Sequence, residues 1–148
     1  MSGIVCAIRG GPDSQPTIAQ AISLAQETEL PLHFLYIVNL DFLSYTSSSR
    51  VHTISRELHQ MGEFILLNAR SLAATQGVTA QGAVRHGHVM EEIVGLCHEI
   101  GANYLVLGYP HPTQKESVFT HESLAQFTGQ TEKQTGAKVV LAKGKGDI

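Results

Sequence analysis

The stretch VLGYPHPTQKESVFTHES, residues 106–123, carries residue types that suit the binding of an anion. It runs from an apolar segment into Gly108 and then into a loop that contains hydroxyl groups and Lys115. Glycine lets backbone N–H groups approach a phosphate closely, and the start of a helix is a favourable place for negative charge. Arg9, just after the first apolar segment of the chain, adds a second positive charge. The alternative is that Arg9 pairs with Asp13 or another acid, and that the serines of the loop only cap a helix.

Histidine is frequent, with 8 in 148 residues, and this raises the question of a metal site. Six of the histidines form pairs along the chain: His52 with His59, His86 with His88, and His111 with His121. Imidazole binds transition metals, but a metal site needs roughly three or four ligands at a recognisable spacing. Neither H-E-x-x-H nor C-x2-C occurs in the chain. We therefore predict ordinary surface or capping roles for the histidines and no metal site.

Nucleophilic chemistry is equally unsupported by the sequence. The motif G-x-S-x-G is absent, and neither cysteine stands beside an obvious base. Cys6 lies in an apolar strand-like segment and Cys97 on the apolar side of a helical pattern, so both are predicted to be buried thiols and not a disulfide pair. We predict no catalytic residue and no enzymatic activity.

Length and charge exclude several classes of protein. A chain of 148 residues fits one domain with a real core. Its formal net charge of -3 and its 10 scattered Lys and Arg residues provide no basic stripe, so nucleic acid is not an expected partner. No apolar run approaches the ~20 residues that span a bilayer, and no basic leader precedes GIVCAI. These features predict a soluble, cytoplasmic protein that does not enter a membrane.

Five short segments predict β-strands. Residues 4–8, 32–38 and 104–108 are almost continuously apolar, as in parallel strands that are covered on both faces. Residues 78–85 mix small and polar side chains, and residues 138–143 form a short segment with lysine at both ends. We therefore expect the first three segments in the centre of a sheet and the other two at its edges.

The longest predicted helix covers residues 51–73. Its apolar residues follow a three-four spacing, which indicates one buried face. That face is predicted to consist of Val51, Ile54, Leu58, Met61, Ile65 and Leu72. Serines at 47–49 are candidate caps, and Gly77 follows the end of the helix.

Three further helices separate the remaining strands. Residues 89–100 form a clean apolar stripe, with two acids in the first turn and Gly101 as the stop signal. A first helix follows GGPDS and is predicted to bury Ile18, Ala21, Ile22 and Ala25. The last helix is polar, is interrupted by Gly129, and begins somewhere between Glu116 and Ser123.

Strands and helices that alternate in this way predict an α/β fold with a single doubly wound, five-stranded parallel sheet. Each crossover must be right-handed, so helices cover both faces of the sheet. With the first, second and fourth strands in the centre, the strand order is 3-2-1-4-5. Ligands of such sheets bind beyond the carboxyl ends of the strands where the winding direction reverses, here between strands one and four. The loop RGGPDS and the loop at 106–123 are expected to meet there.

Three blocks of this chain resemble the universal stress protein family in their order and spacing. They are IVCAIRGGPDSQPTIAQAISLA, HGHVMEEIVGLCHEIGANYLVLG and GAKVVLAKG, and together they extend the resemblance over nearly the full length. The resemblance implies one universal stress protein-like domain over residues 1–148.

ATP-binding members of that family carry the pattern G-x2-G-x9-G-[ST] and an aspartate at the end of the first strand. Gly108 matches the first position of the pattern, but the other three positions hold His111, His121 and Glu122. Arg9, followed by Gly10, stands in place of the aspartate. The resemblance implies a nucleotide or anion site at Ala7, Arg9, Gly10, Ile37, Leu107, Gly108, His111, Lys115, Ser117 and Ser123.

These departures weaken the expectation of ATP binding. Histidine tolerates the backbone geometry of a phosphate loop less well than glycine, and Glu122 adds negative charge beside a triphosphate. We therefore predict a regulatory or interaction module that does not bind ATP in the family's usual manner and needs no cofactor. Two alternatives remain open: a member that binds ATP, AMP or another nucleotide through a variant loop, and an enzyme or metal-binding derivative suggested only by the histidine content.

The final strand predicts a homodimer. Members of the family join two copies through this strand, which lies antiparallel to its symmetry mate, and VVLA in residues 137–143 presents an apolar edge. The alternative is that Lys138 and Lys143 keep this edge monomeric. A further protein partner is expected but not identified by the sequence.

Overall fold

The computed structural model describes residues 2–9, 14–40, 48–108 and 121–142, and its centre is a five-stranded parallel sheet. The strands are β1 (Ile4–Ala7), β2 (Leu32–Val38), β3 (Ala80–His86), β4 (Tyr104–Gly108) and β5 (Lys138–Ala142). The helices are α1 (Gln15–Thr28), α2 (Ser48–Thr75), α3 (Val89–Ile100) and α4 (His121–Thr135). The strand order is β3-β2-β1-β4-β5, so the predicted fold class and strand order are confirmed.

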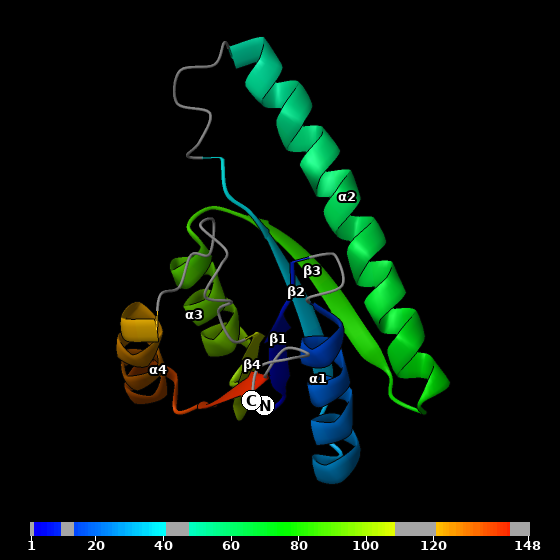
Figure 1. Ribbon diagram of the computed structural model, residues 1–148, viewed down its shortest axis with the longest axis vertical. Helices are drawn as coiled ribbons and strands as arrows, with labels where there is room; N and C mark the ends of the chain where they lie inside the picture. The colour runs from blue at the N-terminus through cyan, green and yellow to red at the C-terminus, as the bar shows by residue number, and fades with distance from the viewer. Residues whose placement is uncertain (1, 10–13, 41–47, 109–120, 143–148) are drawn as a thin grey trace.

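Helices cover both faces of the sheet, with α1 and α2 on one side and α3 and α4 on the other (Figure 1). Side chains alternate between these faces, as a strand period of two requires. Ile4 and Cys6 belong to the buried cluster under α1 and α2, whereas Val5 belongs to the cluster under α3 and α4. Because β1 is buried on both faces, its sequence is apolar throughout.

Strand boundaries differ from the predictions by one or two residues at β1 and β3, and the predicted end of the last strand, residue 143, lies outside the described residues. The chain 78–85 was expected to be extended, but β3 begins at Ala80, where it first pairs with Leu32 of β2. Similarly, β1 ends at Ala7, the last residue that pairs with β2. Strand ends are therefore fixed by the neighbouring strand, which a single segment of sequence does not reveal.

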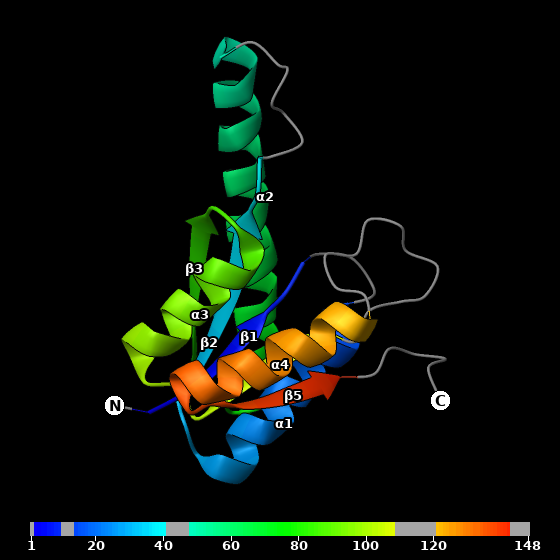
Figure 2. The same ribbon diagram turned by 90° about the vertical axis from the view of Figure 1, so that its left-hand side faces the viewer.

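Helix α2 differs most from its prediction. It covers 28 residues, including two of the serines that were expected to cap it. At ~1.5 Å per residue it is about 42 Å long, and its N-terminal part projects beyond the sheet (Figure 2). Gly77 follows the helix end with a positive φ of 77°, as predicted.

The predicted buried face of α2 is partly wrong. Met61 and Leu72 are exposed, and the residues buried instead are Gly62, Leu66, Ala69 and Ala73. This part of α2 is apolar around most of its circumference, so spacing alone does not fix the helix rotation. The small residues decide it, because the backbone at Gly62 lies directly against the Tyr36 ring of β2.

The other helices agree better with the sequence. The predicted buried stripe of α1 is confirmed, and α3 ends at Ile100, followed by Gly101 with a φ of 68° as the predicted stop. Helix α4 begins at His121 and continues through Gly129, contrary to the expected interruption. Phe127 and Thr131, which are buried on either side of this glycine, anchor the helix. None of the helices in the described ranges is long and apolar enough to cross a membrane.

Candidate functional site

The candidate site lies at the carboxyl edge of the sheet, where β1 and β4 are neighbours and the winding direction reverses. Ala7, Ile37 and Leu107, which were predicted to contribute to it, all belong to the apolar layer under α3 and α4. The structure therefore brings the three apolar residues of the predicted site to one face of the sheet. Leu107 is buried, whereas Ala7 and Ile37 are half-buried.

Gly108 ends β4 on the opposite face, beside the first turn of α1. A Cβ atom at Gly108 would lie 3.0 Å from the Thr17 Oγ1 atom, and Thr17 is buried. This close approach places the N-terminal end of α1 next to the carboxyl end of β4. The partial positive charge of a helix N-terminus therefore lies at the predicted anion site.

A polar contact connects the end of β1 to the start of α1. The backbone N–H of Arg9 donates a hydrogen bond to the Ser14 Oγ atom at 3.3 Å. Ser14 is buried, and its side chain does not cap α1. The bond thus joins the residue just after β1 to the residue just before α1, where an anion at the candidate site would approach.

The Arg9 side chain is exposed, and its charge acts on Tyr36 of β2. Burial raises the pKa of the Tyr36 hydroxyl, and the positive charge of Arg9 opposes that increase. A cation therefore stands just beyond the end of β1, near enough to Tyr36 for its charge to act on that hydroxyl. Asp13, the alternative partner of Arg9, lies outside the described residues.

Four of the ten predicted site residues lie outside the described residues. Gly10, His111, Lys115 and Ser117 fall there. Ser123 lies within α4, but its side chain is not among those described. The assignment of these residues to a phosphate loop stays a prediction.

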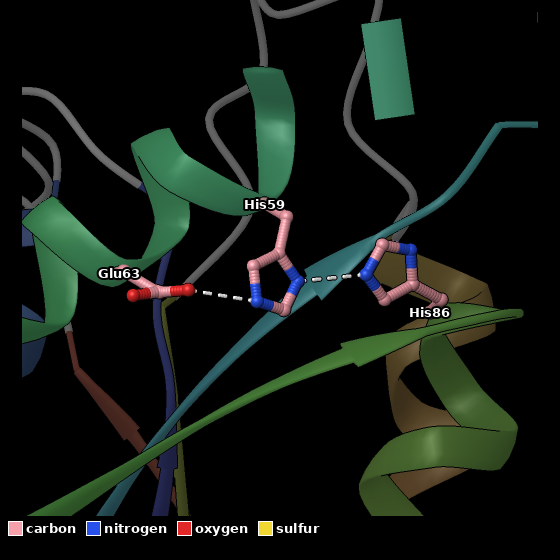
Figure 3. Close-up of polar contacts among 3 residues, drawn as sticks. All are labelled: His59, Glu63 and His86. Atoms are coloured by element: carbon pink, nitrogen blue, oxygen red, sulfur yellow. Dashed lines mark hydrogen bonds and ion pairs between the residues drawn. The ribbon is translucent and has the colours of Figure 1, made fainter. Parts of the chain in front are cut away.

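His59 of α2 and His86 of β3, which belong to different pairs along the sequence, lie side by side in the structure (Figure 3). His59 Nδ1 lies 2.9 Å from His86 Nε2, and His59 Nε2 lies 2.8 Å from Glu63 Oε1. The carboxylate of Glu63 accepts a hydrogen bond from the His59 Nε2–H group, so His59 links an acid and a second imidazole in one chain of hydrogen bonds. In the described parts of the chain, no group of three or more His, Cys, Asp or Glu side chains could hold a metal ion.

Both cysteines are buried and unpaired, as predicted. Burial raises the pKa of the Cys97 thiol to about 12 and that of the Cys6 thiol even further above its ordinary value. The thiolate is the nucleophilic form of cysteine, so neither residue is activated for nucleophilic attack near neutral pH.

The fold and the order of the elements agree with comparisons to known proteins. The model of the family described as "Universal stress protein family" matches residues 1–141. The universal stress protein YxiE of Bacillus subtilis is 27% identical over 113 residues, which cover 71% of this chain and 76% of that protein.

Solved structures of low sequence identity share the fold. The universal stress protein UspA from Lactobacillus plantarum superposes with a TM-score of 0.75 at 13% identity, covering 95% of this chain and 97% of that one. A universal stress protein from Archaeoglobus fulgidus in complex with dAMP gives a TM-score of 0.63 at 13% identity, covering 97% and 98% of the two chains. From the family match over residues 1–141, this chain belongs to the universal stress protein family.

Proposed function

We propose that this protein is a regulatory or interaction module that does not bind ATP in the usual manner of its family. The observation that carries the proposal is Arg9 at the end of β1, where the resemblance implies an aspartate in ATP-binding members. A carboxylate accepts hydrogen bonds, whereas a guanidinium only donates them. Arg9 therefore cannot replace an acidic contact to a nucleotide, and it brings a side chain of opposite charge to that place.

The single match to the nucleotide pattern has a packing explanation. Gly108 stands where α1 approaches β4 so closely that a side chain would press on Thr17. Glycine is therefore favoured at this position whether or not a phosphate binds. Its presence is weak support for an ATP site.

The alternative is a member that binds AMP, ATP or another nucleotide through a variant loop. The N-terminal end of α1 and the charge of Arg9 favour an anion at the candidate site. A relative of the same fold has been solved with dAMP, which makes a nucleoside monophosphate a reasonable first ligand to test. We further propose that the module acts in the cytoplasm with a protein partner, which cell fractionation and co-purification would test.

Isothermal titration with ATP, ADP and AMP in the presence of Mg²⁺ separates the two proposals. We expect no submicromolar ATP affinity, and such an affinity would overturn the first proposal. Submicromolar to micromolar binding of AMP alone would favour the alternative.

A combined variant tests the physical reason. Arg9→Asp together with His111→Gly, His121→Gly and Glu122→Ser restores the family pattern and should raise ATP affinity. Arg56→Gln on the exposed side of α2 is the control, because the combined variant loses two positive units at position 9 and regains one at position 122, and Arg56→Gln gives the same net change of one unit. It should leave the affinity unchanged, and a gain with Arg56→Gln would assign the effect to net charge alone.

A further inference from the structure

A groove of about 600 Å³ lies at the outer edge of the sheet, between α2 and β3. Its lining includes Glu63, Phe64, Leu67 and Arg70 of α2 and Gly82 and Val84 of β3, and these six residues define the outer groove. It lies on the opposite side of the sheet from β5, and its lining contains none of the residues predicted for the nucleotide site. Figure 1 shows α2 lying alongside β3 at this edge.

The backbone of β3 is open towards the groove. The Gly87 N–H donates to the Val38 oxygen of β2. In a parallel pair the N–H and C=O groups of every second residue point to the same neighbour, so those of the odd-numbered residues of β3 point towards β2. The N–H and C=O groups of Gly82 and Val84 consequently face away from the sheet. Arg70 Nε donates to the Ala80 oxygen at 3.0 Å, which agrees with this alternation. In the described part of the chain, β2 is the single strand that pairs with β3, so this edge can accept another strand.

Large apolar side chains stand beside this open edge. Phe64 is 63% exposed and Leu67 is 56% exposed, and both line the outer groove. Met61 and Leu72 are also exposed, but they do not line the groove. At about 100° of rotation per residue, they lie on the other flank of α2. The apolar surface beside β3 therefore consists of Phe64 and Leu67.

Two oppositely charged residues of α2 line the outer groove at positions that a two-fold axis could pair. Glu63 and Arg70 are two helical turns apart, with their midpoint between Leu66 and Leu67. That midpoint is level with Gly82, because a Cβ atom at Gly82 would lie 3.2 Å from the Leu66 Cβ atom. A two-fold axis perpendicular to the sheet, lying just outside β3 at the level of Gly82, would therefore place Glu63 opposite Arg70 of the partner subunit, and Arg70 opposite the partner's Glu63.

The same axis also gives a suitable separation of the helices. Two β3 strands paired across it would lie one strand spacing apart, about 4.8 Å. Helix α2 packs on both β2 and β3, so the two copies of α2 would lie about two strand spacings apart, or ~10 Å. Packed helices are separated by about 8–10 Å. The exposed Phe64 and Leu67 side chains would fill the seam between them.

We propose that the outer groove binds a second copy of this chain. The two β3 strands pair antiparallel about Gly82, the two α2 helices pack antiparallel, and the Glu63–Arg70 pairs close both ends of the contact. The bond from Arg70 to the Ala80 oxygen is compatible with this arrangement, because a carbonyl oxygen has a second lone pair. The resulting contact buries apolar side chains that a monomer leaves in water.

Leu67→Asp and Leu72→Asp are a matched pair that tests the proposal. Both change an exposed leucine of α2 to the same residue, but only Leu67 lines the groove. Sedimentation equilibrium should give Leu67→Asp at most half the mass of the wild type and Leu72→Asp the wild-type mass. Circular dichroism should show native helix content for both. An unchanged mass for Leu67→Asp, or an equal decrease for Leu72→Asp, would overturn the proposal.

Two further variants test the two-fold register. Glu63→Arg and Arg70→Glu alone should each weaken association about tenfold, because two attractive surface pairs become repulsive. The double variant should regain the wild-type affinity, and failure to do so would disprove the register. Leu67→Cys lies beside the axis and should form a covalent dimer on mild oxidation, whereas Leu72→Cys should not. The native thiols are buried and do not compete, so an absent Leu67→Cys crosslink would contradict the contact directly.

Discussion

At the scale of single residues, the buried thiols give this protein a testable alkaline sensitivity. Burial raises the pKa of the Cys97 thiol from 9.0 to about 12, so the folded state keeps a proton that the unfolded chain loses above pH 9. The stabilising contribution is complete below pH 9 and is lost as the pH rises towards 12. The free energy of unfolding should therefore fall by about 1 kcal/mol per pH unit in that interval.

The measurement is urea unfolding at pH 8 to 11 for the wild type, Cys97→Ala and Leu96→Ala. Cys97→Ala should lose part of the pH slope, although buried Cys6 shifts in the same direction and retains its share. Leu96→Ala truncates a neighbouring buried residue of α3 and should lower stability equally at every pH. Identical slopes for all three proteins would show that Cys97 does not ionise on unfolding.

Some residue-level features could be predicted and others could not. The burial of Cys6 and Cys97 followed from their apolar neighbours. The contact between His59 and His86 could not be predicted, since it joins residues 27 apart on a helix and a strand. It depends on how α2 is rotated above β3, and the apolar spacing predicted an incorrect rotation because α2 is apolar on several sides.

At the scale of elements, Gly62 sets the packing of α2 on β2. A Cβ atom at this position would overlap the Tyr36 ring. Gly62→Ala should therefore destabilise the protein by roughly 1–3 kcal/mol, although alanine is the better helix former. Gly95→Ala is the matched control in α3, where a Cβ atom would meet nothing within 4 Å. It should stabilise the protein by up to about 1 kcal/mol.

Thermal and urea unfolding of both variants would check this expectation. In a Tyr36→Ala background, Gly62→Ala should lower the free energy of unfolding much less than it does in the wild type, because the overlapping ring is then absent. Equal stabilisation by both glycine substitutions would mean that α2 can move away from the sheet freely.

Elements were predictable where one physical cause dominated. Central parallel strands are buried on both faces, so β1, β2 and β4 appeared as continuous apolar segments. Helix α3 was predictable because its apolar stripe, its acidic first turn and Gly101 all indicate the same boundaries. The continuation of α4 through Gly129 was not predictable, because the helix is mostly polar. Its buried residues include Phe127 and Thr131, one on each side of the glycine.

At the scale of the whole molecule, the strand order was predictable from apolar content, but the groove beside the β3 edge was not. The β3 edge depends on side chains of α2 that come together only in the fold. Part of the outward-facing backbone of β5 is hydrogen-bonded within the chain, because the Val139 N–H donates to Glu132 Oε1 at 3.3 Å. The Lys138 N–H donates to the Asn103 oxygen next to β4, so alternation turns the Leu141 N–H outward.

We propose that β5 also joins two copies of the chain, through antiparallel pairing of residues 137–143. Leu141→Pro removes an outward N–H without removing a bond to β4, and it should abolish this contact. Leu141→Ala loses similar packing but keeps the N–H, so it should preserve the contact. Light scattering would distinguish them, and equal masses for both variants would argue against pairing through β5.

The two edges lie on opposite sides of one sheet, so their contacts are independent and their variants should combine. If both contacts form, the wild type is a tetramer or a longer ribbon, because two different two-fold contacts on opposite edges need not close. Leu67→Asp should then leave dimers joined through β5, and Leu141→Pro should leave dimers joined through β3. The variant with both changes should be monomeric at concentrations where either single variant is dimeric. A double variant that keeps the mass of a single variant would mean that a third surface, distinct from both edges, holds the copies together.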